Sequence, residues 1–393
     1  MKLAFVVQRY GAEIAGGSEA HCRAIAHQLA ARHEITVLTS CASDYVSWRN
    51  TYAAGEQRDG AVRVFRFRVQ QPRDLHAFAD LSDEVFDGAA PRDRQEEWFR
   101  ANGPDVPELL DHLRQRGATY DLVLFWTYRY APSFFGVPIV KDRAVLVPTA
   151  EEDRTFDLDI LAEFFTLPAA YLFLTPEEQT LVASRAASPL GPSAVIGMGL
   201  EPTAPTADRS LLQSHGIARD YVLYLGRVDR NKGCHTLLDH FQAYAGSVAS
   251  DDVTLVLAGP AKMRIPEHPR IRALGYVADD LRRALLAHAR ALIVPSPYES
   301  LSIALLEGWN YGVPAIVNAR CAVLQGQVRR ANGGLPYRSG EEFCEAMAYF
   351  QSHDAERRAI GEQGRAYVDR EYRWPMVTQR VERLLGEVKR TKR

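Results

Sequence analysis

The sequence ALIVPSPYESLSIALLEGWNYGVPAIVN, residues 291–318, contains two short apolar runs on either side of a helical pattern. The runs ALIVPS (291–296) and PAIVN (314–318) are continuous in hydrophobicity rather than alternating, which is typical of strands buried on both faces of a parallel sheet. Between them we expect a helix over about residues 300–311, because serines precede it and Gly-Val-Pro follows it. The stretch therefore predicts a strand–helix–strand unit of an α/β fold.

The same alternation extends over the whole chain. An amphipathic helix is predicted at 18–33, with Ser18 as its N-cap after two glycines. The stretch GLEPTAPTADRS (199–210) is predicted to be a linker, since it is rich in Pro, Thr and Ala and has no apolar periodicity. Further strands are predicted at 2–7, 34–40, 62–67, 121–126, 144–149, 171–175 and 194–197 before this linker, and at 221–226, 253–259 and 271–276 after it. We therefore expect two doubly wound α/β domains with a ligand at the carboxyl ends of their strands, in the cleft between the halves.

The composition indicates a soluble globular protein. Of the 393 residues, 47% are hydrophobic and 24% are charged, and the net charge of −2 argues against a general nucleic-acid-binding protein. The five scattered cysteines form no CxxC motif, so neither a disulfide framework nor a zinc site is predicted. No apolar run is long enough for a signal peptide or for a membrane span, which takes about 20 residues. We expect a cytoplasmic protein whose membrane contact, where it has one, is peripheral at the inner face.

Two carboxylates in the opening stretch need a partner. Glu299 lies in the turn before the predicted helix, and Glu307 lies eight residues later among apolar neighbours. Helical geometry separates them by about 12 Å along the axis and about 80° around it, so they are expected to contact two parts of one elongated ligand. Backbone N–H groups near Ser300, Leu301 and Ser302 would face an anion between them. A ribose diol would satisfy Glu307; alternatively, Glu307 lies at a solvent edge and Glu299 is a surface turn residue.

A second motif, LGRVDRNKG (225–233), leaves a predicted strand and leads into the predicted helix CHTLLDHFQAYA. Arg227 and Lys232 precede the N-terminus of that helix, and two cations beside free N–H groups form an anion site suited to a diphosphate. In the alternative interpretation, Arg227 pairs with Asp229 and Lys232 is merely exposed.

Two further segments are candidates in the first half of the chain. Gly16 and Gly17 precede a predicted helix, where a backbone without side chains can contact a phosphate or a sugar; a plain turn is the alternative. Glu151 begins the acidic sequence EED (151–153) at the end of a predicted strand. Like charges there raise at least one pKa and provide an acid or base, unless the loop is simply solvated. The chain has no dinucleotide-binding G-x-G-x-x-G, no P-loop and no metal-ligand spacing among its histidines.

The C-terminal segment 371–393 is predicted to be an amphipathic helix after Pro375, with seven Lys and Arg residues against three Glu residues. Its basic side is either a solvated helix end or a contact for an anionic membrane surface or an acidic partner.

Three of these motifs, in this order, resemble those of the retaining GT-B glycosyltransferases of family 4. GGSEAH (16–21) resembles the N-terminal glycine loop of the family, and LYLGRVDRNKG (223–233) resembles its Arg/Lys diphosphate motif. Glu299 and Glu307 resemble its E-x7-E signature, and Trp374 with the last helix also fits. The resemblance spans nearly the whole chain.

The resemblance implies the GT-B fold, in which two Rossmann-like domains face each other across a cleft and the last helix crosses back to the first domain. The first domain, on the acceptor side, would comprise residues 1–198 and 372–393. The second domain, which binds the nucleotide-sugar, would comprise residues 205–371.

The resemblance also implies roles for single residues. Arg227 and Lys232 would hold the donor diphosphate, Glu299 would contact the sugar hydroxyls and Glu307 would bind the ribose. Other positions implied to lie near the donor are Gly16 and Gly17 at the phosphate and sugar, the backbone of Ser300, Leu301 and Ser302 beside the sugar, and Gly275 and Tyr276 near the base. Glu151 departs from the family, many members of which have His here, so it could orient the sugar, hold the acceptor or have no catalytic role.

The activity implied by the resemblance is transfer of a hexosyl group from a nucleoside-diphosphate sugar to a hydroxyl acceptor, with retention of configuration and without a metal or cofactor, in glycan or glycoconjugate biosynthesis. The acceptor would be a glycan, a lipid-linked molecule or a small molecule. Two other functions are compatible with the motifs. A nucleotide-sugar epimerase on the same fold would turn over donor without an acceptor, and a non-catalytic protein would bind a nucleotide or glycan without turnover.

Overall fold

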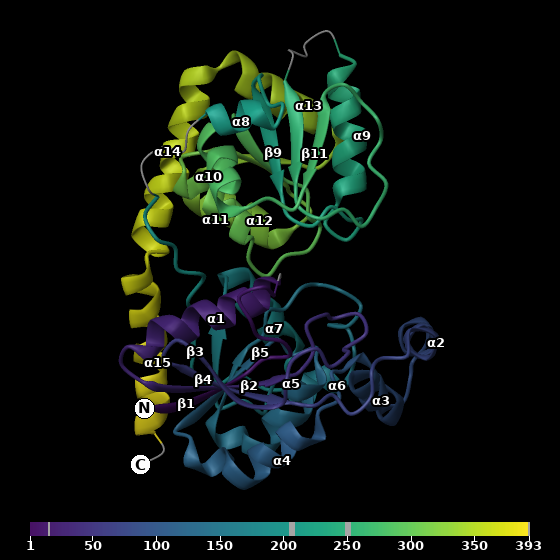
Figure 1. The fold of residues 1–393 in the computed structure, drawn as a ribbon, viewed down its shortest axis with the longest axis vertical. Helices are drawn as coiled ribbons and strands as arrows, with labels where there is room; N and C mark the ends of the chain where they lie inside the picture. Colours follow the sequence, from purple (N-terminus) through teal and green to yellow (C-terminus); the bar gives the residue numbers. More distant parts are fainter. Residues whose placement is uncertain (15, 204–208, 248–252, 392–393) are drawn as a thin grey trace. The chain divides into compact units, whose positions relative to one another are not determined.

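The computed structural model describes residues 1–14, 16–203, 209–247 and 253–391. These residues form two compact α/β units (Figure 1). Unit 1 comprises Met1–Gly199 and Trp374–Arg393, and unit 2 comprises Leu200–Arg373. The predicted class, two doubly wound α/β domains, is confirmed. Residues 204–208 of the predicted linker, which include the predicted start of the second domain at 205, lie outside the described residues.

Unit 1 is built on an eight-stranded sheet with the order β3-β4-β2-β1-β5-β6-β7-β8. All neighbouring strands pair in parallel except β3 and β4. The strands are β1 (Lys2–Val6), β2 (Glu34–Ser40), β3 (Gly55–Asp59), β4 (Val62–Phe67), β5 (Leu122–Trp126), β6 (Ala144–Val147), β7 (Ala170–Phe173) and β8 (Ser193–Val195). The helices are α1 (Gly17–Ala30), α2 (Leu75–Asp87), α3 (Arg92–Asn102), α4 (Pro107–Arg116), η1 (Gly117–Thr119), α5 (Ala131–Gly136), η2 (Val137–Arg143), α6 (Ile160–Phe164), α7 (Pro176–Arg185) and α15 (Trp374–Arg390).

The core of unit 1 follows from its apolar strands. Every residue of β5 (LVLFW) and β6 (AVLV) is buried, as expected for central parallel strands covered on both faces. Strand β3 was not predicted, because its sequence GEQRD is polar throughout and has no apolar alternation. It pairs with β4 as an antiparallel edge strand and is almost wholly exposed. Because neither of its faces is buried, its sequence has no hydrophobic pattern from which a strand could be predicted.

Helix α15 returns the end of the chain to unit 1, where it packs against α1 and β8 (Figure 1). Its apolar face is buried in this packing and consists of Val377, Val381, Leu384, Leu385 and Val388. An amphipathic helix inserts into a membrane through its apolar face, and here that face is part of the core. Only the polar side of α15 therefore remains for an anionic surface. Among the described residues, no helix has the length and apolar character needed to cross a membrane.

Unit 2 contains a six-stranded, wholly parallel sheet with the order β11-β10-β9-β12-β13-β14. Its strands are β9 (Tyr221–Leu225), β10 (Thr254–Ala258), β11 (Ile271–Gly275), β12 (Ala291–Val294), β13 (Ala315–Asn318) and β14 (Gly334–Tyr337). Its helices are α8 (Ser210–Ser214), α9 (Cys234–Ala245), α10 (Asp279–His288), α11 (Ile303–Asn310), α12 (Ala322–Ala331), α13 (Gly340–Ser352) and α14 (Asp354–Glu371). The predicted strand–helix–strand unit is β12–α11–β13. Strand β14 was not predicted, since GLPY is short and contains a proline, which only an edge strand tolerates.

Candidate functional site

Two loops at the carboxyl edge of the unit 2 sheet bring predicted site residues together. Lys232 lies between β9 and α9, Glu299 lies between β12 and α11, and β9 and β12 are neighbours in the sheet. The Nζ atom of Lys232 lies 2.9 Å from Oε1 of Glu299. The Glu299 side chain is only 12% exposed and the Lys232 side chain 31%, so the loops cover the carboxylate more than the cation.

Arg227 lies in the same loop as Lys232 and forms an ion pair with Oδ2 of Asp229. The other oxygen of Asp229, Oδ1, accepts a hydrogen bond of 2.8 Å from the backbone N–H of Lys232. The structure thus contains the Arg227–Asp229 pair that the sequence left open as an alternative. Lys232, however, is not merely exposed, because Glu299 pairs with it. Asp229 therefore orients the loop that carries both cations.

Close backbone packing brings the loops after β9, β10 and β12 together. A Cβ atom on Gly233 (φ +72°) would lie 2.3 Å from the carbonyl oxygen of Pro295, just after β12. A Cβ atom on Gly259 (φ +147°), just after β10, would lie 1.9 Å from the carbonyl oxygen of Gly226. Only glycine fits at these two positions. The three loops consequently form one continuous rim at the carboxyl edge of the sheet.

The predicted helix start after Glu299 is confirmed. Helix α11 begins at Ile303, and Ser302 is its N-cap, with Oγ accepting a hydrogen bond of 3.3 Å from the backbone N–H of Leu305. Ser300 and Leu301 are buried in the turn between Glu299 and this cap. The N-terminus of α9 lies on the same rim, after Gly233 and without a side-chain cap. Helix N-termini attract anions, and the rim brings two of them together with two cations, each of which is paired with a carboxylate.

Glu307 has a partner that the sequence analysis did not identify. Arg282 of α10 forms an ion pair with Oε1 of Glu307, whose side chain is 16% exposed. Burial raises the pKa of the Glu307 carboxyl, and Arg282 opposes this shift. Arg282 therefore already balances the charge of Glu307, and the predicted contact of Glu307 with a ribose diol stays a prediction. Nothing in the motif around Glu307 points to an arginine 25 residues earlier on another helix.

Tyr276, implied by the resemblance to lie near a base, follows the end of β11. Its side chain is strongly exposed, and Gly275 before it has a φ of +68°. An exposed aromatic ring at the carboxyl end of a strand is available for stacking against a planar group.

The glycine loop of unit 1 lies over a buried ion pair. Nη2 of Arg9 lies 2.5 Å from Oε1 of Glu19, and the two side chains are 7% and 5% exposed. Helix α1 begins at Gly17 with Gly16 as its N-cap, so the prediction of Ser18 as the N-cap is wrong. The Ser18 hydroxyl instead donates a hydrogen bond of 2.9 Å to Oε2 of Glu19. A Cβ atom on Gly16 would collide with Glu19, whereas one on Gly17 would meet nothing within 4 Å.

Glu151 lies in the loop after β6 and is partly buried. The acidic sequence around it is not a group of uncompensated like charges, because Asp153 forms an ion pair with Arg129. Oδ1 of Asp153 also accepts hydrogen bonds of 3.1 and 3.2 Å from the backbone N–H groups of Thr155 and Phe156. Asp153 is therefore compensated by Arg129, and the predicted role of Glu151 as an acid or base stays a prediction.

A buried carboxyl that the sequence analysis missed anchors this loop. Glu178 of α7 is fully buried, and its two oxygens accept hydrogen bonds of 2.7 Å from the N–H of Ala150 and 2.6 Å from the N–H of Leu174. Burial raises the pKa of Glu178 from 4.5 to about 8. In the sequence TPEE, Glu178 looks like an ordinary exposed acid in the first turn of a helix. Its burial, which the sequence does not reveal, is what sets it apart from such residues. Glu178 holds the backbone immediately before Glu151.

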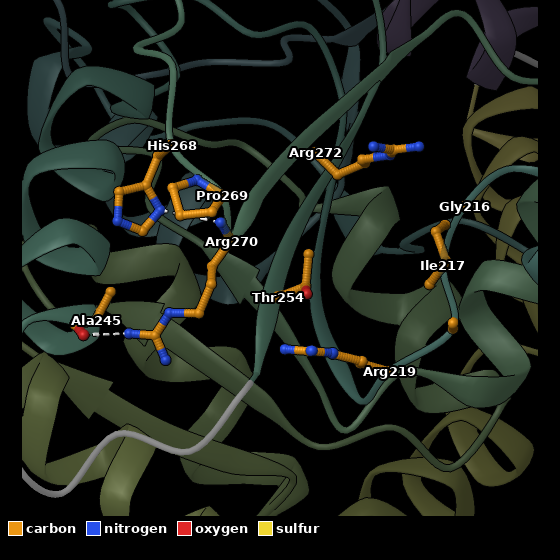
Figure 2. A pocket seen from close by; sticks show the side chains of 10 residues that line it. Gly216, Ile217, Arg219, Ala245, Thr254, His268, Pro269, Arg270 and Arg272 are labelled. Atoms are coloured by element: carbon orange, nitrogen blue, oxygen red, sulfur yellow. Dashed lines mark hydrogen bonds between the residues drawn. The ribbon is translucent and has the colours of Figure 1, made fainter.

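A pocket of about 710 Å³ in unit 2 lies away from the predicted site residues (Figure 2). It is at the amino ends of β9, β10 and β11, and its basic lining side chains are Arg219, His268, Arg270 and Arg272. Figure 2 shows Arg270 donating to the carbonyl of Ala245. The predicted residues of unit 2 lie at the opposite, carboxyl edge of the same sheet. Within the described ranges, no cluster of three or more His, Cys, Asp or Glu side chains could hold a metal ion.

Comparison with known proteins relates both sequence and fold to sugar-transferring enzymes. Residues 219–352 match the family described as "Glycosyl transferases group 1". The O-antigen chain mannosyltransferase B of Escherichia coli is 30% identical over 131 residues, which is 29% of this chain and 33% of the relative. The chain thus spans about a third of the length of this curated relative.

Two solved structures cover almost the entire chain. Sucrose-phosphate synthase from Thermosynechococcus elongatus superposes with a TM-score of 0.73 at 17% identity, covering 99% of each chain. HepE of Anabaena in complex with UDP-glucose superposes with a TM-score of 0.70 at 16% identity, covering 98% of this chain and 100% of HepE. Together the two parallel-sheet units have the GT-B fold, and within unit 2 residues 219–352 are similar to the glycosyl transferases of group 1.

Proposed function

We propose that this chain is a glycosyltransferase that moves a hexosyl group from a nucleoside-diphosphate sugar to a hydroxyl acceptor with retention of configuration. The observation that carries the proposal is the cluster of Arg227, Lys232 and Glu299 beside the N-termini of two helices at one edge of the unit 2 sheet. This cluster combines two cations suited to a diphosphate with a carboxylate suited to sugar hydroxyls.

Donor binding would exchange internal ion pairs for contacts with the donor. Lys232 would transfer from Glu299 to the diphosphate, which leaves the Glu299 carboxylate to accept hydrogen bonds from the sugar. Arg227 would transfer from Asp229 to phosphate oxygens, which its guanidinium can bind in a bidentate manner. Asp229 would keep its hydrogen bond to the backbone N–H of Lys232, so the loop retains its conformation.

In the transfer step, the bond between the anomeric carbon and the β-phosphate oxygen breaks, and its electron pair stays on the diphosphate. Arg227, Lys232 and the helix N-termini stabilise the charge that develops there, and one such preorganised donor typically contributes about 10²–10³ in rate. The acceptor hydroxyl forms the new bond from the face that the diphosphate leaves, and its proton passes to a phosphate oxygen. In this proposal Arg227 and Lys232 neutralise the diphosphate charge that a metal ion would otherwise neutralise.

Glu307 would bind the ribose, Tyr276 would contact the base, and the backbone of Ser300, Leu301 and Ser302 would lie beside the sugar. In unit 1, Gly16 and Gly17 would approach the phosphate and sugar, and Glu151 would contact the sugar or the acceptor. A nucleotide-sugar donor is supported by HepE, which was solved with UDP and with UDP-glucose. A glycan acceptor is supported by the O-antigen chain mannosyltransferase, and a lipid-linked or small-molecule acceptor stays a prediction.

The proposal is tested first by the donor. Nucleoside-diphosphate sugars that bind the folded chain will raise its melting temperature by mass action, and the best of them is then used for transfer to a panel of glycan, lipid-linked and small-molecule acceptors. Conversion of the donor without any acceptor would indicate an epimerase instead. Binding without turnover over the whole panel would indicate a binding protein.

The second test is the variant Arg227→Ala, for which we expect kcat/KM to fall by about 10²–10³. Arg230→Ala is the matched control, because Arg230 is an exposed arginine of the same loop and should be dispensable. Full activity of Arg227→Ala would contradict the proposed role of the cations. Activity that is lost with a chelator and restored by Mn²⁺ would contradict the metal-independent mechanism.

A further inference from the structure

The ion pair between Arg282 and Glu307 leaves part of the carboxylate unused. Arg282 contacts Oε1, and within the described part of the chain Oε2 of Glu307 has no hydrogen bond. An ionised carboxylate offers about four lone-pair positions on its two oxygens. The pair therefore satisfies the charge of Glu307 while leaving acceptor positions for two further hydroxyl donors.

Glu307 needs a nearby cation to stay ionised. It lies in α11 between Leu306 and Gly308, which are both fully or almost fully buried, and burial of this kind raises the pKa of its carboxyl. Arg282 opposes the shift, while Asp279, on the same helix as Arg282, adds to it. Tyr311, just after α11, also interacts electrostatically with Glu307. Arg282 is thus the group that favours the charged form of Glu307.

From this geometry we propose that Arg282 is a positioning residue of the nucleotide site: it holds Glu307 ionised and oriented, so that the carboxylate accepts both hydroxyls of a ribose diol. The inference rests on the proposed function, because it takes the ligand of Glu307 to be the ribose of a nucleoside diphosphate. Arg282 acts through Glu307 and touches no reacting atom. Without Arg282, Glu307 takes up a proton, and a protonated carboxyl is a poorer acceptor for two hydroxyls.

The neighbouring arginine provides a matched control. Arg283 lies on the same helix but pairs with Asp280 within α10, and its side chain is 51% exposed. Arg282→Met and Arg283→Met therefore remove the same charge from adjacent positions, and methionine keeps most of the aliphatic stem. Only the first substitution removes the partner of Glu307. Arg282→Lys restores a cation at the critical position.

The experiment measures binding rather than turnover. UDP, GDP and ADP are titrated into the full chain by calorimetry, and the tightest binder is followed from pH 6 to pH 9 in each variant. We expect the affinity of Arg282→Met to fall by about tenfold for each pH unit below the new pKa of Glu307, because only the ionised fraction binds. At pH 9 the affinity should return towards that of the parent chain. The parent, Arg283→Met and Arg282→Lys should show little change over the same range. A 2′,3′-dideoxynucleoside diphosphate should bind the parent and Arg282→Met equally well at every pH.

Each other outcome overturns the inference in a recognisable way. Tighter binding by Arg282→Met would mean that Arg282 competes with the nucleotide for Glu307. A loss that is equal at all pH values, in a variant with an unchanged circular dichroism spectrum, would assign Arg282 a role in packing alone. An equal loss for the dideoxy compound would exclude the ribose diol as the ligand. If the parent chain binds none of the three diphosphates, the proposed function itself is wrong.

Discussion

Two acidic side chains act on the backbone beside the candidate residues. The carboxylate of Asp229 accepts a hydrogen bond from the backbone N–H of Lys232. The carboxyl of Glu178 accepts one from the backbone N–H of Ala150, which immediately precedes Glu151. Glu178 lies outside the motifs found in the sequence, and Asp229 lies within LGRVDRNKG but was expected there only as an alternative partner of Arg227. Each fixes the conformation of a strand-to-helix loop, so the site depends on side chains that would contact no substrate.

At the scale of the residue, we predict that Glu178 makes the stability of the chain fall as the pH rises. The pKa of Glu178 is raised from 4.5 to about 8 in the folded protein. The folded state therefore keeps a proton that the unfolded chain releases, and this contribution is complete below pH 4.5 and declines up to about pH 8. Replacing Glu178 with glutamine should reduce the fall in the free energy of unfolding by up to about 1.4 kcal/mol per pH unit. Urea unfolding at pH 5, 6.5 and 8 measures the slope.

Glu177→Gln is the control for this prediction, because Glu177 is the preceding residue of the same helix and is not buried. It should leave the pH dependence of the parent chain unchanged. Identical slopes for the parent and Glu178→Gln would show that Glu178 does not titrate as its burial requires.

At the scale of the element, the two glycines at the start of α1 should respond differently to alanine. A Cβ atom at Gly16 would lie 2.2 Å from Oε2 of Glu19 and 3.1 Å from Nη2 of Arg9, so it would displace the buried ion pair. We expect Gly16→Ala to cost about 1–3 kcal/mol of stability, as overpacking does. At Gly17 there is open space, so Gly17→Ala should fold normally.

The same pair of variants tests the proposed approach of the glycine loop to the donor. If Gly17 contacts a phosphate or sugar, Gly17→Ala will keep the melting temperature of the parent chain but lower its kcat/KM for sugar transfer. An active Gly17→Ala with parental kinetics would remove Gly17 from the site. A Gly16→Ala variant as stable as the parent would contradict the packing argument.

Strands were easier to predict than helix caps. A strand depends on the burial of several apolar residues, whereas a cap depends on the hydrogen bonds of a single side chain. The apolar residues of β2 and β4 gave the observed bounds of those strands. Strand β2 is buried after its first residue, whereas β4 alternates buried and half-buried residues, as a strand with one covered face does. The cap of α1 was assigned to Ser18 because serine commonly caps helices, but Glu19 binds the Ser18 hydroxyl and Gly16 takes the cap position. Before α11 the same preference left Ser300 and Ser302 open, and the structure shows Ser302 as the cap.

At the scale of the whole molecule, the chain leaves unit 1 at Gly199 and returns to it at Trp374. These two residues pack closely, because a Cβ atom on Gly199 would lie 2.2 Å from the indole ring of Trp374. The exit of the chain and the start of α15 are thus joined at a point where only glycine leaves room for the ring.

We therefore predict that Gly199→Ala destabilises unit 1 by about 1–3 kcal/mol, since a rigid ring cannot yield to the added methyl group without a backbone shift. Thermal unfolding measures the loss, and hydrogen exchange should report faster opening in β8 and α15. Gly88→Ala serves as control, because its nearest contact would be an ordinary 3.8 Å. Unchanged exchange in α15 would show that the Gly199–Trp374 contact does not secure this helix.

Most of the buried strands of this protein, and the residues proposed for its site, can be read from local features of the sequence. Apolar runs, helix-ending glycines and charged loops are local features, and burial and backbone sterics translate them directly into strands, turns and helix starts. The partners of these residues depend on the three-dimensional fold. Lys232 meets Glu299 across 67 residues because β9 and β12 are neighbours in the sheet, and Arg282 meets Glu307 because α10 and α11 bring them together. A charged side chain inside a fold pairs with the group that packing places beside it, and that neighbour is set by the order of the strands rather than by spacing along the chain.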